Sequence, residues 1–225
     1  MTAAVGTQPQ RKLPIVILIS GRGSNMRAIA VRAASGELPV EVRAVISDKA
    51  DAPGLATAAA MNIPTRSLSA REFADRPSYD QALAALVQSF EPELVVLAGF
   101  MRILSPGFIA AFADRILNIH PSLLPLYRGL HTHRRALDAG DVVHGCSVHF
   151  VTEELDGGPL VIQAQVKVLP GDSESSLSAR VQQQEHRIYS QAIDWFAQGR
   201  LRLREQRAWL DDRPLQAPVI QTASP

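Results

Sequence analysis

The stretch IVILISGRGSN, residues 15–25, decides the fold class of this chain. Its first part, Ile15 to Ser20, is a continuous apolar run rich in β-branched residues. A strand with one face in water would alternate apolar and polar residues, so this run predicts a strand covered by helices on both faces. Two glycines then lead into a helical pattern from Asn25 to Ala34. A buried strand, a glycine turn and a helix together form the start of a βαβ unit.

The same order of elements recurs along the chain. Further strands are expected at Val40–Ser47, Thr65–Leu68, Leu94–Phe100 and Ile116–His120, and helices at Pro53–Met61 and Ser78–Phe90. Alternating strands and helices favour parallel pairing with right-handed crossovers. The sequence therefore predicts an α/β fold, a Rossmann-like and mostly parallel sheet with helices on both faces.

After His120 the pattern changes, and antiparallel strands are expected toward the C-terminal half. The expected elements are a short helix at His133–Ala139, strands at Ser147–Thr152 and Leu160–Val168, a long helix at Ser175–Ala197 and a hairpin at Leu201–Leu210. Nothing inside this region reads as a linker, so we predict one domain over residues 15–210. Residues 1–14 and 211–225 are predicted to be disordered tails.

Composition excludes several classes of protein. Lysine and arginine total 23 against 22 acidic residues, which gives no electrostatic case for binding nucleic acid or an anionic membrane. The single cysteine, Cys146, cannot close a disulfide within the chain. The apolar stretches are far shorter than the roughly 20 residues that span a bilayer, and the N-terminus lacks the apolar core of a signal peptide. We therefore expect a cytoplasmic protein.

The glycine turn SGRGSN, residues 20–25, is the first candidate site. Gly23 lets the backbone approach a ligand, the helix N-terminus offers free amides, and Ser24 and Asn25 add side-chain donors, so the turn suits one phosphate. It is a poor dinucleotide motif because the third glycine would fall at Met26. The alternative is a glycine turn in which Ser24 or Asn25 only caps the helix.

The second candidate is NIHPSLLP, residues 118–125. Asn118 and His120 are two apart on a strand and so share one face, and Pro121 ends the strand. Their side chains should lie at the carboxyl edge of the parallel sheet, where open α/β folds bind ligands. An amide beside an imidazole suits acyl transfer, in which one stabilises an oxyanion and the other moves a proton. The alternative is a polar strand end that caps loop backbone.

Two further stretches surround this pair. In ELDGGP, residues 154–159, Asp156 either initiates a tight turn or, if its strand lies beside that of Asn118, reaches the imidazole. In LAGFMRILSP, residues 97–106, an apolar strand breaks at Gly99 into a loop with exposed backbone groups, which suits a flat heterocycle or plain core packing.

The histidines raise the question of a metal. His131, His133, His144 and His149 are close in sequence, but residues two apart on a helix do not face one another, and no His-Glu-x-x-His pattern occurs. We therefore expect no metal site, and leave open that one of these histidines lines the pocket.

Taken together and in order, these stretches resemble the folate-dependent phosphoribosylglycinamide formyltransferases. The matching segments are LISGRGSN at 18–25, VLAGFMRILSP at 96–106, LNIHPSLLP at 117–125, HGCSVHFVTEELDGGP at 144–159 and QQQEH at 182–186. The resemblance runs from about Ile15 to Leu210. It implies transfer of a formyl group from the co-substrate 10-formyltetrahydrofolate to the amine of glycinamide ribonucleotide, a step of purine synthesis, without a metal.

The resemblance also implies roles for individual residues. The N-terminal half would bind phosphate through Gly23, Ser24 and Asn25, with Gln182 assisting and Glu185 on the ribose. Asn118, His120 and Asp156 would be the catalytic residues. The C-terminal half would bind folate, and the residues implied in that pocket are Arg76, Met101, Arg102, Ile103, Leu104 and Asn118.

Three other functions remain to be distinguished. Formyltetrahydrofolate hydrolases resemble the chain around Asn118 and His120 but carry an N-terminal regulatory domain, and only about 14 residues precede the first strand here. Methionyl-tRNA formyltransferases append an RNA-binding domain, for which we expect no room after Leu210. A non-catalytic nucleotide-binding module on the same sheet is the third. The expected partners are therefore two small molecules, with no nucleic acid or membrane, acting on a monomer or homodimer.

Overall fold

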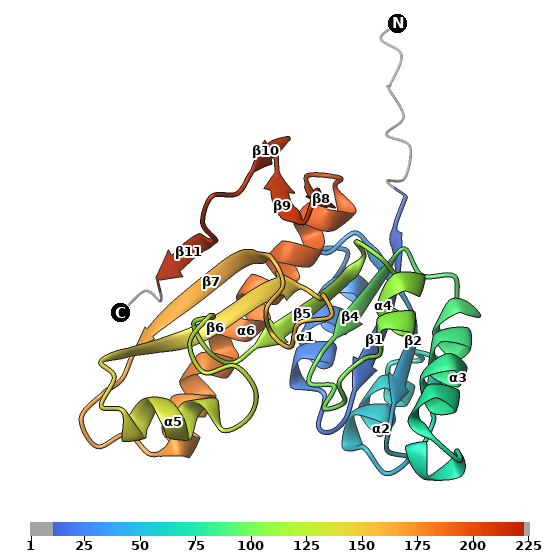
Figure 1. The fold of residues 1–225 in the computed structure, drawn as a ribbon, viewed down its shortest axis with the longest axis horizontal. Coiled ribbons are helices and arrows are strands. Elements are labelled where there is room, and N and C mark those ends of the chain that lie inside the picture. Colours follow the sequence, from blue (N-terminus) through green and yellow to red (C-terminus); the bar gives the residue numbers. More distant parts are fainter. Residues whose placement is uncertain (1–10, 223–225) are drawn as a thin grey trace, which may run out of the picture.

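The computed structural model describes residues 11–222, which form one large sheet with helices packed on both faces (Figure 1). Its strand order is β11-β7-β6-β5-β4-β1-β2-β3. The strands are β1 (Leu13–Ile19), β2 (Val40–Ser47), β3 (Thr65–Ser67), β4 (Leu94–Leu97), β5 (Ile116–His120), β6 (Val143–Phe150), β7 (Leu160–Lys167) and β11 (Val219–Thr222). Strands β1 to β5 are mutually parallel, whereas β6 is antiparallel to both β5 and β7. The predicted fold class is confirmed.

Alternate residues of β1 enter two separate hydrophobic cores. Ile15, Ile17 and Ile19 pack with apolar residues of α1 and α6, and Val16 and Leu18 pack with those of α3 and α4. All five are completely buried, which explains why the strand has no polar alternation. The helices are α1 (Ser24–Ser35), α2 (Pro53–Ala60), α3 (Arg76–Gln88), α4 (Pro106–Ala111), α5 (Thr132–Asp138) and α6 (Glu174–Ala197), with a 3₁₀ turn η1 at Ala70–Glu72.

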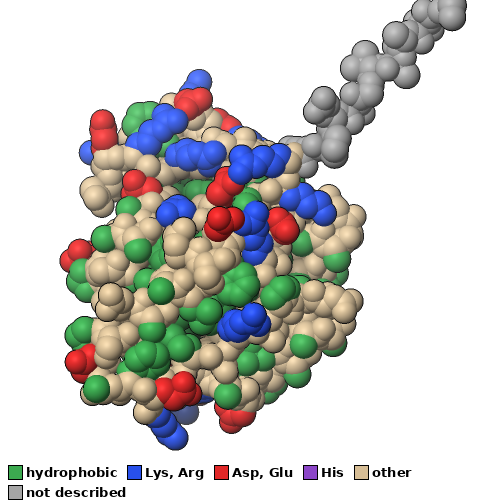
Figure 2. Space-filling model, turned by 90° about the vertical axis from the view of Figure 1, so that its right-hand side faces the viewer, with side chains coloured by type: hydrophobic (Ala, Val, Ile, Leu, Met, Phe, Trp, Pro, Cys, Tyr) green, Lys and Arg blue, Asp and Glu red, His purple; other side chains and the backbone are tan. Residues whose placement is uncertain are grey.

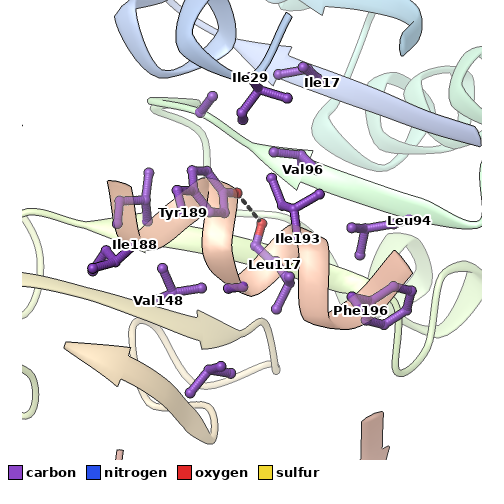
Figure 3. Packing of buried hydrophobic residues seen from close by; sticks show 14 of the residues in the cluster. Ile17, Ile29, Leu94, Val96, Leu117, Val148, Ile188, Tyr189, Ile193 and Phe196 are labelled. Carbon is purple, nitrogen blue, oxygen red and sulfur yellow. Dashed lines mark hydrogen bonds between the residues drawn. The ribbon is translucent and has the colours of Figure 1, made fainter. Parts of the chain in front are cut away.

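Helix α6 packs chiefly against β6 and β7 and reaches β4 and β5 through Tyr189. It begins with a capping box between Ser173 and Ser176, and its apolar face packs on the sheet (Figure 3). The Tyr189 hydroxyl lies 3.0 Å from the Leu97 carbonyl oxygen and 2.8 Å from that of Leu117. A completely buried phenol thus joins the last residue of β4 to the second residue of β5.

The structure corrects several predicted boundaries. The strand expected over Leu94–Phe100 ends at Leu97, because Gly99 turns the chain with a φ of 80°. The strand expected over Ser147–Thr152 runs from Val143 to Phe150. Helix α4 was not predicted, since its six residues are too few to show a periodic pattern.

The predicted C-terminal tail is wrong for part of its length. The hairpin at 201–210 is present as β8 (Leu201–Arg204) and β9 (Arg207–Leu210), but β10 (Arg213–Pro214) and β11 follow within residues 211–225. Strand β11 extends the main sheet by pairing in parallel with β7. Its four residues offer too short a pattern to distinguish a strand from a loop. Of the other predicted tail, Leu13 and Pro14 belong to β1, and residues 1–10 lie outside the described residues.

The surface carries charges of both signs. On the face shown in Figure 2, basic and acidic side chains lie beside one another, which agrees with the formal net charge of +1. Within residues 11–222, no helix combines the length and apolar character needed to cross a membrane.

Gly54 is required where α2 meets the glycine turn. Its amide donates to the Gly21 carbonyl oxygen at 3.0 Å, and an added Cβ would lie 2.9 Å from that oxygen and 2.5 Å from Ile19 Cδ1. Gly107 in α4 is a matched control, because an added Cβ would meet only Ser105 Oγ at 4.0 Å.

We predict that Gly54→Ala lowers the free energy of unfolding by about 1–3 kcal/mol, because the backbone of the turn must shift. Gly107→Ala should leave it unchanged or raise it by about 0.5–1 kcal/mol, since alanine is the better helix residue. Urea denaturation of both variants measures the difference. Equal stabilities would contradict the tight contact.

Candidate active site

Three predicted segments meet at one edge of the sheet. Strand β4 lies between β1 and β5 and is parallel to both, so the carboxyl ends of all three strands point the same way. The glycine turn follows β1, the 99–104 loop follows β4, and Asn118 and His120 end β5. This is the edge where open α/β sheets bind ligands.

The imidazole of His120 and the carboxylate of Asp156 lie together, as the sequence predicted. His120 Nδ1 is 3.4 Å from Asp156 Oδ2, and the two side chains are 7% and 10% exposed. The other ring nitrogen, Nε2, lies 3.0 Å from the Tyr127 carbonyl oxygen, and the Gly129 amide donates to Asp156 Oδ2 at 2.9 Å. Both ring nitrogens therefore face oxygen acceptors, which a doubly protonated imidazole can satisfy.

His149 completes this cluster, although the sequence singled it out only as one of several histidines. It lies directly opposite Asn118 in the register of β6 on β5. Its Nδ1 is 2.9 Å from the Phe150 carbonyl oxygen and so carries the hydrogen, which leaves Nε2 to accept from Asn118 Nδ2 at 3.1 Å. Burial lowers the pKa of His149 to about 4. A neutral imidazole therefore holds the Asn118 amide in one orientation.

The glycine turn is tied to the neighbouring loop. Gly23 adopts a left-handed φ of 69° and precedes the first residue of α1. No side chain caps this end of the helix, so the amides of its first turn are free to bind a ligand. The Ser20 amide donates to the Gly99 carbonyl oxygen at 3.1 Å, and the Met101 amide donates to Ser20 Oγ at 2.8 Å. The predicted phosphate turn and the loop at 99–104 therefore hold one another in place.

The long helix reaches the turn through Glu185. Asn25 Nδ2 donates to Glu185 Oε2 at 2.8 Å, and burial raises the pKa of that carboxyl group. Asn25 Oδ1 is buried without a hydrogen-bond partner among the described residues, as expected of an atom that awaits a ligand. Half-buried Gln182 lies three residues before Glu185 and so on the same side of α6.

A cavity of about 80 Å³ opens beside Asn118 and His149. Its walls are formed by Leu97 at the end of β4, by Ile109 of α4, and by the loops at 99–104 and 151–156. The predicted site residues among them are Arg102, Ile103, Leu104, Asn118 and Asp156. A neighbouring cavity of about 610 Å³ contains Arg76, whose Nη2 donates to the Ile103 carbonyl oxygen at 2.7 Å. Met101 is exposed at the rim of the loop. A larger cavity of about 830 Å³ lies between α4, the 151–160 segment and β8–β9, and none of the predicted site residues lines it.

The remaining histidines are not arranged as metal ligands. His133 Nδ1 and His144 Nε2 lie 3.1 Å apart and share a hydrogen bond, and exposed His131 precedes α5. Among residues 11–222, no group of three or more His, Cys, Asp or Glu side chains is placed to hold a metal ion.

Comparison with known proteins identifies the family. Residues 13–193 match the model of the formyl transferase family. The chain is 56% identical over 201 residues to the phosphoribosylglycinamide formyltransferase of Escherichia coli, covering 89% of this chain and 95% of that protein. It is 47% identical to the enzyme of the same name from Haemophilus influenzae, with the same coverage.

The chain belongs to the formyltransferase family. A solved structure of the phosphoribosylglycinamide formyltransferase from Coxiella burnetii agrees with this assignment, with a TM-score of 0.89 and 46% identity over 93% of this chain and 99% of that one. The predicted resemblance to folate-dependent formyltransferases of purine synthesis is thereby confirmed.

Buried neutral histidines in and near the candidate site should make the free energy of unfolding depend on pH. Burial lowers the pKa of both His144 and His149 to about 4, against an ordinary value of 6.5. Between these values the unfolded chain binds protons that the folded chain does not, so the free energy of unfolding falls as pH falls.

We predict a loss of about 1–2 kcal/mol for His144 alone between pH 7 and pH 5. Urea denaturation at both pH values, on the natural chain and on His144→Asn, should show a smaller pH effect in the variant. An unchanged difference between the two pH values would contradict the assignment of a neutral His144.

Proposed function

We propose that the chain transfers the formyl group of 10-formyltetrahydrofolate to the amine of glycinamide ribonucleotide. The products are formylglycinamide ribonucleotide and tetrahydrofolate. The observation that carries the proposal is the cluster of Asn118, His120 and Asp156, which borders the cavity beside the 99–104 loop at the same edge of the sheet as the glycine turn. An anion site on one side and an apolar slot on the other suit two different substrates that meet at one carbonyl carbon.

The ribonucleotide binds at the glycine turn. Gly23, Ser24 and Asn25 hold its phosphate at the uncapped start of α1, where amide groups and the helix dipole both favour an anion. Glu185 accepts hydrogen bonds from the ribose hydroxyls, and Gln182 assists from the same side of α6. The unpartnered Asn25 Oδ1 fits a ligand that brings a donor.

The folate occupies the cavity beside Asn118. Met101, Arg102, Ile103 and Leu104 contact the pterin chiefly through their backbone, and Arg76 lies at the outer end, where a folate carries its carboxylates. Arg102 stacks 4.5 Å from the Tyr79 ring centre, which keeps its side chain on the wall and leaves the loop backbone to face the ligand.

The chemistry requires one oxyanion to be stabilised and one proton to be moved. The amine attacks the formyl carbon and forms a tetrahedral intermediate with an oxyanion and an ammonium group. Asn118 Nδ2 donates to that oxygen, and protonated His120 acts as an adjacent positive charge, since both of its ring nitrogens already have oxygen partners.

Asp156 accepts the surplus ammonium proton, directly or through a water molecule. When the intermediate collapses, the bond from carbon to folate N10 breaks and N10 takes up the proton that Asp156 had accepted, which returns Asp156 to its carboxylate form. Atoms and charge therefore balance without a metal ion or a covalent enzyme intermediate.

We further propose that the protein acts in the cytoplasm as a monomer or a homodimer. Its substrates are charged metabolites, its one cysteine is buried, and the proposed catalytic residues all come from a single chain.

A direct assay distinguishes the candidate functions. The protein is mixed with 10-formyltetrahydrofolate, with and without glycinamide ribonucleotide, and release of tetrahydrofolate is followed. Consumption that requires the amine supports the transferase. Consumption without it would instead indicate a hydrolase, and no consumption would indicate a binding module.

We predict that Asp156→Asn lowers kcat by about 10²–10⁴-fold, because the group that accepts the proton is lost, while both substrates still bind. Asp138→Asn is the control, since Asp138 is exposed on α5 and pairs with Arg134 one turn away. Steady-state kinetics and substrate titration measure both variants. Turnover by Asp156→Asn close to that of Asp138→Asn would remove Asp156 from the mechanism.

A further inference from the structure

We infer that Gln163, a residue of β7 that lines none of the site's cavities, positions His120 and Asp156 for the proposed reaction. It acts through the loop at 121–131, which joins β5 to α5. Because the reaction itself is a proposal, this inference rests on it and is tested below with one readout that does not depend on activity.

The loop at 121–131 supplies one hydrogen-bond partner to each of the two reactive groups. Its Tyr127 carbonyl oxygen lies 3.0 Å from His120 Nε2, and its Gly129 amide donates to Asp156 Oδ2 at 2.9 Å. A displacement of this backbone would therefore change the surroundings of the imidazole and of the carboxylate together.

Gln163 anchors the first half of this loop from beneath. Its Nε2 donates to the Leu124 carbonyl oxygen at 2.8 Å and to Ser147 Oγ at 2.9 Å. Ser147 Oγ in turn donates to the Ser122 carbonyl oxygen at 2.6 Å and accepts from the Leu124 amide at 3.0 Å. Both hydrogens of the Gln163 amide and the single hydrogen of the Ser147 hydroxyl are thus used to hold the loop.

The sheet register places these groups in one row. His120 is opposite Ser147 in the pairing of β5 with β6, and Ser147 is opposite Gln163 in the pairing of β6 with β7. Directly opposed residues share a face, so the catalytic imidazole and the anchor of its loop are fixed to the same surface of the sheet. Ser147 is completely buried and Gln163 is 7% exposed. Water does not reach these groups, so losing one of their hydrogen bonds would leave a buried polar atom unpaired at a cost in free energy.

The second half of the loop has little apolar anchorage of its own. Leu126 and Leu130 are 56% and 65% exposed, whereas Leu124 beside the anchor is 4% exposed. The outer contacts of this half are polar: the Tyr127 hydroxyl donates to Asp141 Oδ2 at 2.6 Å, and Arg135 Nη1 donates to the Arg128 carbonyl oxygen at 2.7 Å. The anchor reaches this half through Ser122, whose Oγ donates to the Leu126 carbonyl oxygen at 2.6 Å, directly before Tyr127. The role of Gln163 therefore extends beyond filling the core, because it fixes the inner end of the segment that partners His120 and Asp156.

The test replaces Gln163 by methionine, which keeps the length of the side chain and removes both donors. Gln165→Met is the matched control, since Gln165 lies two residues along β7 and forms no hydrogen bond to the loop among the described side chains. We expect Gln163→Met to lower kcat about 10- to 100-fold, because small displacements of reacting groups are costly. KM for both substrates should stay within about threefold, and the pH profile of kcat should shift, because His120 and Asp156 lose their fixed partners.

Hydrogen exchange of the 121–131 amides is the readout that does not depend on catalysis, and it should be faster in Gln163→Met than in Gln165→Met. If Gln163→Met does not fold, Ser147→Ala is measured in the same way. Unchanged exchange together with an unchanged pH profile would overturn the inference. A natural chain without amine-dependent transfer would contradict the proposed function alone, and exchange would still report on the anchor.

Discussion

The antiparallel pairing of β6 with β5 determines what surrounds the end of β5. In this register His149 lies opposite Asn118 and Ser147 opposite His120, so each polar residue of β5 faces a partner fixed on the next strand. The same pairing directs the chain into the loop at 151–158, which returns Asp156 to the imidazole. A slip of β6 by one residue would turn His149 and Ser147 to the other face of the sheet and leave Asn118 and His120 without these partners. The chemistry of the site therefore depends on backbone hydrogen bonds as much as on its side chains.

The two acidic residues of the site have different surroundings. Asp156 accepts from a backbone amide and faces the ring of His120, so it is already partnered. Glu185 has the Asn25 amide as its side-chain partner, and burial raises the pKa of its carboxyl group. A buried carboxylate with spare acceptor capacity is costly until donors arrive. This contrast suits one acid that moves a proton and another that binds hydroxyl groups.

Much of the fold could be predicted because β1 and β4 are continuous apolar runs, β2 ends in one, and helices such as α6 show a clear periodicity. Asn118 and His120 could be placed together because residues two apart share a face. The pairing partner of β5 is a long-range property, so the contact between His149 and Asn118 was not predictable from spacing. The anchor formed by Gln163 and Ser147 joins two strands and a loop that periodicity cannot relate. Strand β11 was missed because four residues, Val219–Thr222, hold too little pattern.

Strand β11 also has a consequence for the solubility of the folded chain. It pairs with residues 162–165 of β7, a strand that reads LVIQAQVK and is apolar over its first half. Without that cover, β7 would be the outermost strand, and its unpaired amides and carbonyls could accept a strand from another molecule. Strand β11 replaces the eight-residue β7 at this edge with a strand of only four residues, and short edge strands offer less backbone for pairing with another chain. A C-terminal segment that lies outside the candidate site thus shortens the exposed border of the sheet.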